Sequence, residues 1–261
     1  MKYQFNNEEH VHTLDGHALT GTSSIGNVLA KPALIQWSAN ETIKYIKENS
    51  SGFEMFEGEQ TKFLSGITEE LLDKARFAHK KKKEKAATEG TDLHTELEKF
   101  VKAEMGKWNY EDDDLDPRIK PFIDWSRANV KEFVASEAHC YDEDLFVGGI
   151  TDCVAEMNDG KLAIIDFKSS KEAYITHFIQ VAGYAIQVEK NGLFSEDGEH
   201  SKKLDKAIEV LIIVPFGAKN IVPDVRYNVQ DYKDGFKAAV KLYRVMGFDK
   251  TIKENAVSNP Q

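Results

Sequence analysis

Apolar residues along the chain recur with two periods, one typical of helices and one typical of strands. The clearest strand pattern flanks Asn158-Asp159-Gly160, where runs rich in apolar and β-branched residues precede and follow the turn. Asn-Asp-Gly between two such runs is a strong signal for a β-hairpin. The apolar run 207–215 ends at a proline and is typical of a buried strand. Further strands are expected at about 134–141 and 221–229.

Apolar positions three and four residues apart predict helices before and after this hairpin. Thr68 is a suitable cap for one helix, and Asn191-Gly192 marks the end of another. We expect a short strand or hairpin and then a helix in 1–50, a loop at 51–67, and an acidic loop at 111–117. The order of helix, three strands, helix and strand predicts an α/β core. The other helices are expected over 68–85, 90–105, 118–134, 175–190 and 235–246.

Three charged residues lie at the open end of the predicted hairpin. Asp152 begins its first strand, while Asp166 and Lys168 end its second. The two ends lie side by side in an antiparallel pair, so the two carboxylates converge. Residues 166 and 168 are two apart, which puts both side chains on one face of the strand. The hairpin therefore presents two carboxylates and one ammonium group at a single place.

Carboxylates with open coordination positions can hold Mg²⁺ or Mn²⁺, which prefer oxygen ligands. Such an ion lowers the pKa of a bound water, and a neighbouring lysine can neutralise charge that develops on phosphorus. The trio thus indicates phosphodiester hydrolysis. Taken alone, Asp166 and Lys168 fit an exposed ion pair at a strand end equally well. The hairpin partner Asp152 and the later Gln180 and Tyr184 favour the functional interpretation.

Four short segments have to be considered together: Gly-Thr-Asp-Leu-His94, Gly-Ile-Thr-Asp152, Ile-Ile-Asp166-Phe-Lys168-Ser-Ser and Gln180-Val-Ala-Gly-Tyr184. They resemble motifs of the PD-(D/E)xK nuclease superfamily, and within it the RecB-type and phage exonuclease branch. The first acid follows Thr where the motif has Pro, a change that this branch tolerates. The resemblance implies a restriction-endonuclease-like core, a central mixed β-sheet flanked by helices, with an N-terminal helical arm. The order and spacing agree over residues 88–190.

The resemblance also implies boundaries and roles. We expect one nuclease domain over 1–261, with the arm at 1–67, the core at 68–250 and a frayed tail at 251–261. One or two Mg²⁺ or Mn²⁺ ions are the expected cofactors. The implied metal ligands are His94, Asp152, Asp166 and the backbone carbonyl of Phe167. The implied catalytic residues are Asp152, Asp166, Lys168, Gln180 and Tyr184.

Three residues near this set have two interpretations each. A lone histidine on an apolar helix face, such as His94, is more often a core residue than a ligand, but the resemblance favours the ligand. Glu98 lies one helical turn from His94 and could orient its imidazole. Glu137 either faces the metal end of the sheet or makes an ion pair within the sheet, and both alternatives stay open.

The net charge of −10 is not that of a protein that coats nucleic acid, although it does not exclude a nuclease. One segment departs from this balance, with Arg76, Lys80, Lys81, Lys82, Lys83 and Lys85 just before Gly90-Thr91. A solvated helix face is the ordinary interpretation of such a run. Its place beside the histidine motif slightly favours contacts to nucleic-acid phosphates, with Thr91 included.

We therefore expect a metal-dependent DNA exonuclease or end-processing enzyme of phage or prophage recombination or replication. The alternatives are a restriction-type endonuclease and a non-catalytic nucleic-acid-binding protein of the same fold. A single-strand-annealing or other recombination protein is an expected partner. Two cysteines, Cys140 and Cys153, exclude a four-thiolate iron–sulfur cluster and suit a reducing cytoplasm. The resemblance implies a bacterial or phage-infected cell. No apolar run approaches the roughly 18 residues of a membrane span, so no membrane association is expected. Strand polarity, strand preference and oligomeric state stay open.

Overall fold

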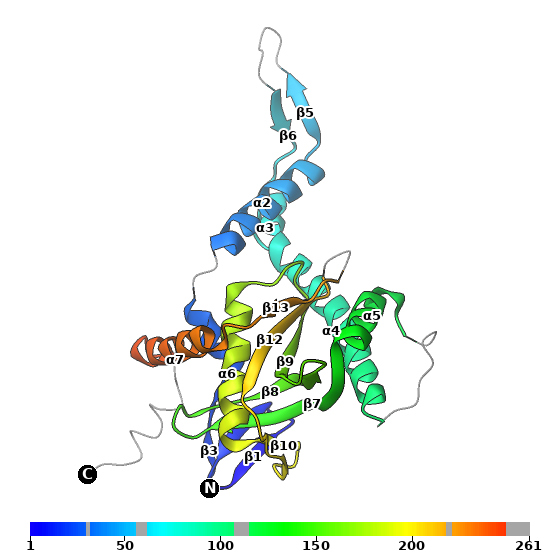
Figure 1. Cartoon of the computed structure of the whole chain (residues 1–261). Helices are drawn as coiled ribbons and strands as arrows, with labels where there is room; N and C mark the ends of the chain where they lie inside the picture. The colour runs from blue at the N-terminus through cyan, green and yellow to red at the C-terminus, as the bar shows by residue number, and fades with distance from the viewer. Residues whose placement is uncertain (30–31, 56–61, 107–114, 218–220, 249–261) are drawn as a thin grey trace, which may run out of the picture. The chain divides into compact units, whose positions relative to one another are not determined.

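The computed structural model describes residues 1–29, 32–55, 62–106, 115–217 and 221–248 (Figure 1). Its contacts divide the chain into two compact units. The main unit comprises residues 1–29 and 90–261, and the arm unit comprises residues 30–89. The predicted boundary between arm and core, after residue 67, falls within the arm unit. Each unit is described separately below.

A mixed β-sheet forms the centre of the main unit. Its strands are β7 (Val130–Asp142), β8 (Val147–Met157), β9 (Leu162–Lys168), β10 (Leu193–Phe194), β11 (His200–Lys202), β12 (Ile208–Pro215) and β13 (Asp224–Arg226). They follow the order β11-β10-β7-β8-β9-β12-β13. Strands β9 and β12 run parallel, and the other neighbours in this order run antiparallel. The predicted α/β class with a mixed central sheet flanked by helices is confirmed.

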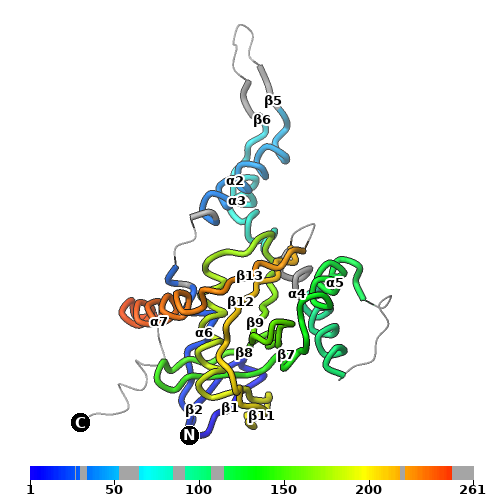
Figure 2. Tube along the Cα trace, viewed as in Figure 1, coloured from blue at the N-terminus to red at the C-terminus, as the bar shows by residue number. Residues whose placement is uncertain are grey.

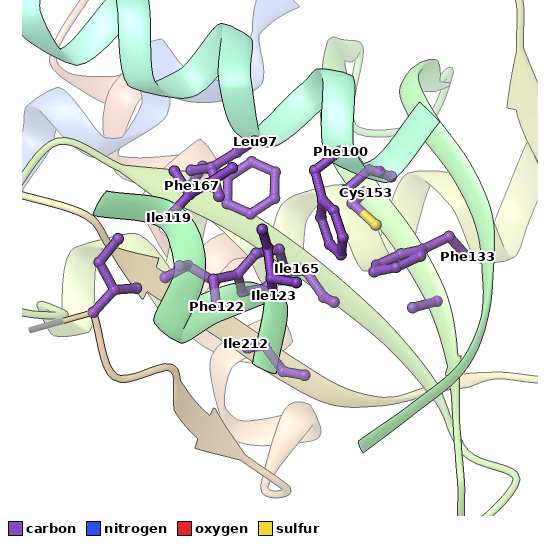
Figure 3. Close-up of a cluster of buried hydrophobic side chains, with 14 of the residues drawn as sticks. Leu97, Phe100, Ile119, Phe122, Ile123, Phe133, Cys153, Ile165, Phe167 and Ile212 are labelled. Atoms are coloured by element: carbon purple, nitrogen blue, oxygen red, sulfur yellow. The ribbon is translucent and has the colours of Figure 1, made fainter. Parts of the chain in front are cut away.

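Helices cover both faces of this sheet. They are α4 (Ala78–Glu104), α5 (Lys120–Asn129), α6 (Ile175–Asn191) and α7 (Val229–Val245), with a 3-10 turn at Pro117–Ile119. Ile165 and Phe167 of β9 pack with α4 and α5, whereas Ile164 packs with α6. This alternation follows the pleat of a strand that is buried on both faces. Figure 3 shows Leu97 and Phe100 of α4 in one buried cluster with Ile165 and Phe167 of β9.

The N-terminal segment adds a small sheet to the main unit. Strands β1 (Tyr3–Asn6), β2 (Val11–Leu14) and β3 (His17–Ala18) pair antiparallel, and β4 (Thr20–Gly21) pairs parallel with β8. Two short helical turns follow, α1 (Thr22–Ile25) and η1 (Gly26–Val28). The expected N-terminal hairpin is confirmed. In this pairing, Thr20 and Gly21 of β4 lie beside Val147 and Gly148 of β8.

The arm unit consists of α2 (Pro32–Asn49), the β5–β6 hairpin (Gly52–Met55 and Lys62–Ser65), α3 (Glu69–Arg76) and the first turns of α4. The predicted cap is confirmed, because Oγ1 of Thr68 accepts a hydrogen bond from the backbone N–H of Leu71 at 3.1 Å. Within this unit, Nζ of Lys82 lies 2.7 Å from Oε1 of Glu41 and links α4 to α2.

Several predicted boundaries are wrong. The segment 51–67 contains the β5–β6 hairpin where a loop was expected. The helix expected over 68–85 breaks at Phe77, whose φ of −106° and ψ of 7° are not helical. Helix α4 then continues through Gly90, where a new helix start was expected. One glycine costs a helix only about 1 kcal/mol, which neighbouring helix-forming residues and tertiary packing can offset.

The boundary between α5 and the first central strand also differs from the prediction. A helix was expected through Val134, but α5 ends at Asn129 and β7 begins at Val130. Val130 pairs with Met157 at the closed end of the β8–β9 hairpin, so pairing with β8 outweighs the local helical pattern. The succession of β7, β8 and β9 can be followed in the green part of the tube in Figure 2. The predicted strand at 221–229 is confined to Asp224–Arg226.

Candidate active site

The β8–β9 hairpin brings the two predicted acids together. Cys153 pairs with Ile165, and the next position outward places Asp152 beside Asp166 and Phe167. The backbone N–H of Phe167 donates to Oδ2 of Asp152 at 2.7 Å. This bond fixes the carboxylate of one strand against the backbone of the other. The predicted hairpin and the convergence of its acids are confirmed. The predicted strand start at Asp152 is wrong, because β8 begins at Val147 and continues through Asp152, paired with β7 on its other side.

Asp166 and Lys168 form an ion pair at the end of β9. Nζ of the lysine lies 2.7 Å from Oδ2 of the aspartate, and Asp166 is only 1% exposed. Burial raises the pKa of Asp166; Lys168 opposes this change and Asp152 reinforces it. Burial also favours the neutral amine of Lys168, but Asp166 and Asp152 outweigh it and raise the pKa of the lysine. The exposed ion pair that the sequence left open is not what the structure has.

His94 comes to the hairpin from α4. Its Nε2 atom lies 3.3 Å from Oδ2 of Asp152, and its ring centre lies 5.8 Å from that of Phe167. The hydrogen bond to Asp152 raises the pKa of His94, against the effect of burial, and the charges of Asp152, Glu137 and Asp166 raise it further. The ring is therefore not an apolar core residue. Phe167 connects both contacts, since its amide holds Asp152 and its ring packs on His94.

Glu137 and Glu98 complete a second group of possible ligands with His94. One atom from each of these three side chains lies within 4.8 Å of the others. Burial raises the pKa of Glu137, and the charge of Asp152 adds to this effect. Its Oε1 atom is buried without a hydrogen-bond partner within the part of the chain that the structure describes. Glu98 forms an ion pair with Lys102.

The backbone of Glu137 is unusual for a strand. Its φ is 50°, although the flanking Ser136 and Ala138 keep regular pairs with Cys153 and Thr151 of β8. A left-handed conformation at a residue other than glycine costs on the order of 1 kcal/mol or more, and such strain clusters at functional sites. Of the two interpretations of Glu137 that the sequence left open, the structure favours the one that faces the acids.

Gln180 and Tyr184 lie one turn apart on α6 and contact each other. Nε2 of Gln180 donates to the hydroxyl of Tyr184 at 2.8 Å. Burial raises the pKa of Tyr184 well above its usual range, and Asp166 adds to the effect, so the phenol stays neutral. The tyrosine ring needs Gly149 on β8, because a Cβ there would lie 2.6 Å from Cε1 of Tyr184. Their predicted common orientation is confirmed.

A cavity of about 340 Å³ adjoins Tyr184 and was not predicted from the sequence. Thr22, Ser23 and Ser24 supply hydroxyl groups to its lining, together with the backbone of Gly149. Thr22 is fixed there, since it donates to the carbonyl of Gly148 at 3.0 Å. The segment Thr-Gly-Thr-Ser-Ser was visible in the sequence, but its place beside α6 depends on the pairing of β4 with β8.

The basic residues of the arm unit that were predicted to bind nucleic acid differ in their surroundings. Lys82 is engaged with Glu41, whereas Arg76, Lys80, Lys81 and Lys83 are exposed. The structure places this segment on the last turn of α3 and the first turns of α4. The side chains of Lys85 and Thr91, also predicted to bind nucleic acid, lie outside the described residues.

Comparison with models of known protein families gives no match for this chain, and no curated protein matches it significantly. The resemblance to the nuclease superfamily therefore rests on the motifs in the sequence. Among the described residues, no helix is both long enough and apolar enough to cross a membrane.

Proposed function

We propose that this protein is a divalent-metal-dependent DNA nuclease with a restriction-endonuclease-like core, and that it acts as an exonuclease or end-processing enzyme. The observation that carries the proposal is the convergence of Asp152, Asp166, Lys168 and His94 from β8, β9 and α4. Two carboxylates, an ammonium group and an imidazole within one partly buried cluster are groups that metal-assisted phosphodiester hydrolysis uses.

The residues present fit a hard divalent cation. Asp166 and Glu137 lie near Asp152, and burial together with the charge of Asp152 disfavours ionisation of these two carboxyl groups. A cation relieves this repulsion, and oxygen-rich sites of this kind suit Mg²⁺ or Mn²⁺. Asp152 and Asp166, the carbonyl of Phe167 and Nε2 of His94 would hold one ion. Glu98 and Glu137 offer ligands for a second ion, and His94 lies close to both groups of ligands.

The bound ion would supply a water of lowered pKa and polarise the scissile phosphate. The protein supplies the rest. Lys168 keeps its charge beside Asp166 and can neutralise the charge that develops on the phosphoryl oxygens. Gln180 and Tyr184 present an amide and a neutral hydroxyl that can orient the attacking water or a phosphate oxygen. The Phe167 amide keeps Asp152 in place.

Cleavage of end-labelled linear DNA and covalently closed circular DNA tests this proposal. Purified protein is incubated with each substrate in Mg²⁺, in Mn²⁺ and in EDTA. We expect cleavage of linear DNA with either ion, none in EDTA, and resistance of the circle. Asp166→Asn should abolish cleavage, while Asp159→Asn, a matched change at the exposed turn of the same hairpin, should not. Cleavage in EDTA, or full activity of Asp166→Asn, would overturn the assignment; cleavage of the circle would support an endonuclease.

A further inference from the structure

An exposed aromatic ring stands at the junction of α3 and α4 in the arm unit. Phe77 ends α3 in a non-helical conformation and is 44% exposed. Nζ of Lys80 lies 5.0 Å from the centre of its ring. A single exposed apolar residue is ordinary on a protein surface, so exposure alone assigns nothing to Phe77. The charged residues around the ring distinguish Phe77 from an ordinary exposed apolar residue.

Charge changes sign along this helical segment. Glu69 and Glu70 occupy the first turn of α3, whereas the segment from Arg76 to Lys83 is basic. Glu70 is paired with Lys74 at 2.5 Å, which neutralises part of the acidic end. Phe77 thus lies where the surface becomes cationic, in a chain whose net charge is −10.

The lysines of this segment differ in their contacts. Lys82 points to α2, where it pairs with Glu41 at 2.7 Å. Residues advance by about 100° around a helix, so Lys80 and Lys83 share a side that is turned away from Lys82. Lys80, Lys81 and Lys83 are exposed. One lysine therefore links two helices of the arm unit, and the other three stay accessible. Of these three, Lys80 lies over the aromatic ring and Lys81 lines the groove beside it.

A groove of about 660 Å³ runs beside the ring. Phe77 and Lys81 line one part of it, and Asp73, one helical turn before Phe77, lines another. A nucleotide at this place would meet an aromatic face and an ammonium group together. Asp73 would repel the phosphate of this nucleotide, and Lys80 and Lys81 would attract it. The charges would therefore orient the phosphate towards the lysines and away from Asp73. The groove lining is Glu69, Glu70, Asp73, Lys74, Phe77 and Lys81.

We infer that Phe77, Lys80, Lys81 and Lys83 form a binding site for single-stranded nucleic acid, with a base stacked on Phe77 and phosphates on the lysines. Stacking on aromatic side chains beside a cationic groove is how proteins hold single strands. The base faces of a duplex are covered by their neighbours, so a protruding ring has no face to stack on there. The inference rests on the proposed function only in taking nucleic acid as the substrate, and it needs no catalysis.

Fluorescence anisotropy with the full chain in EDTA tests the site without cleavage. The probes are a labelled oligothymidine, an abasic strand of the same length, and a duplex. Phe77→Leu should weaken binding of oligothymidine roughly tenfold, the effect of losing one stacked base. It should leave binding of the abasic strand and the duplex unchanged. Phe77→Trp should keep or improve the affinity, and Asp73→Asn should raise it for both single strands.

Ile43→Ala is the matched control, because Ile43 is exposed on α2 of the same unit and should have no effect on any probe. Equal affinity of Phe77→Leu and wild type for oligothymidine would overturn the inference. An equal loss on the abasic strand would overturn it as well, because the ring would then not act through bases. If Phe77→Leu melts below the assay temperature, the affinity of Phe77→Trp and Phe77→Tyr for the two single strands decides instead. Binding of single strands can depend on Phe77 whether or not the protein cleaves DNA. A negative result for the binding site would therefore leave the proposed nuclease activity untouched, and the reverse also holds.

Discussion

Nε2 of His94 lies 3.3 Å from Oδ2 of Asp152, which joins helix α4 to the first strand of the central hairpin. The pKa of His94 is raised to about 9, first by this hydrogen bond and then by the surrounding carboxylates, against burial. In the metal-free protein the imidazole is therefore protonated at neutral pH and balances part of the negative charge. A metal ion must displace that proton in order to use the nitrogen.

The first prediction is that the metal-free protein becomes less stable as pH rises from about 6 to 9. A histidine of raised pKa stabilises the fold fully below its unfolded pKa of about 6.5, and this contribution is lost as pH approaches 9. Glu137, with a pKa raised to about 8 by burial, acts in the same direction, because the folded state loses a proton that the unfolded state has already lost. In EDTA, Tm should fall on the order of 5 °C across this range.

Two variants identify the groups responsible. Glu137→Gln should flatten the decrease of Tm with pH, because the amide cannot ionise. Glu132→Gln, at an exposed position of the same strand, should leave the decrease unchanged. Differential scanning calorimetry at pH 6, 7, 8 and 9 measures both. A Tm that is constant or rises over this range would contradict the protonation states described for the cluster.

The second prediction concerns capture of the metal. Asp152→Ala should remove a ligand and also release the Phe167 amide from its acceptor. Mn²⁺ affinity and DNA cleavage should then be lost together. Isothermal titration with Mn²⁺ at pH 8 measures the affinity, and Asp159→Asn provides the control on the same hairpin. Unchanged Mn²⁺ affinity in both Asp152→Ala and Asp166→Asn would show that the ion binds elsewhere.

The third prediction separates Lys168 from metal binding. Its ammonium group pairs with Asp166, and under the proposed function it acts on the transition state. Lys168→Ala should keep Mn²⁺ and DNA binding but lose about 10²-fold or more in cleavage rate, as removal of one preorganised charge does. Lys161→Ala, at the residue just before β9, should cleave at the wild-type rate. Single-turnover kinetics make the comparison, and near-normal cleavage by Lys168→Ala would assign the role to another group.

The features that the sequence predicted well depend on short-range geometry. The turn at Asn158-Asp159-Gly160 and the alternation on either side of it specify the hairpin, and Asp166 and Lys168 then necessarily share a strand face. Gln180 and Tyr184 meet because residues four apart lie on one side of a helix. No long-range information is needed for any of these contacts.

The features that the sequence missed depend on distant parts of the chain. The left-handed backbone of Glu137 is held by pairing between β7 and β8, and nothing in its local sequence calls for a positive φ. The motif at Gly90 suggested a helix start, but α4 passes through it without a break. The break occurs at Phe77, where the apolar periodicity gives no warning. Tertiary packing sets each of these positions.

The last prediction concerns the exposed lysines as binding groups for phosphates. Neutralising Lys80, Lys81 and Lys83 together should weaken binding of all DNA sequences alike, because phosphate contacts carry no sequence information. The dependence of log K on log salt should flatten by roughly 0.7 to 0.9 for each phosphate that is no longer neutralised, and Mn²⁺ affinity should not change.

Lys82→Gln is the matched control for this triple variant. Lys82 belongs to the same run but is paired with Glu41, so its replacement should leave the salt dependence as it is. A partly exposed pair of this kind contributes only about 0–1 kcal/mol to stability, so the variant should also remain folded. Anisotropy titrations between 50 and 200 mM salt, roughly the range over which phosphate binding changes strongly, measure the slopes. If the triple variant matches wild type in both affinity and slope, the lysines are surface residues of a solvated helix and hold no phosphate.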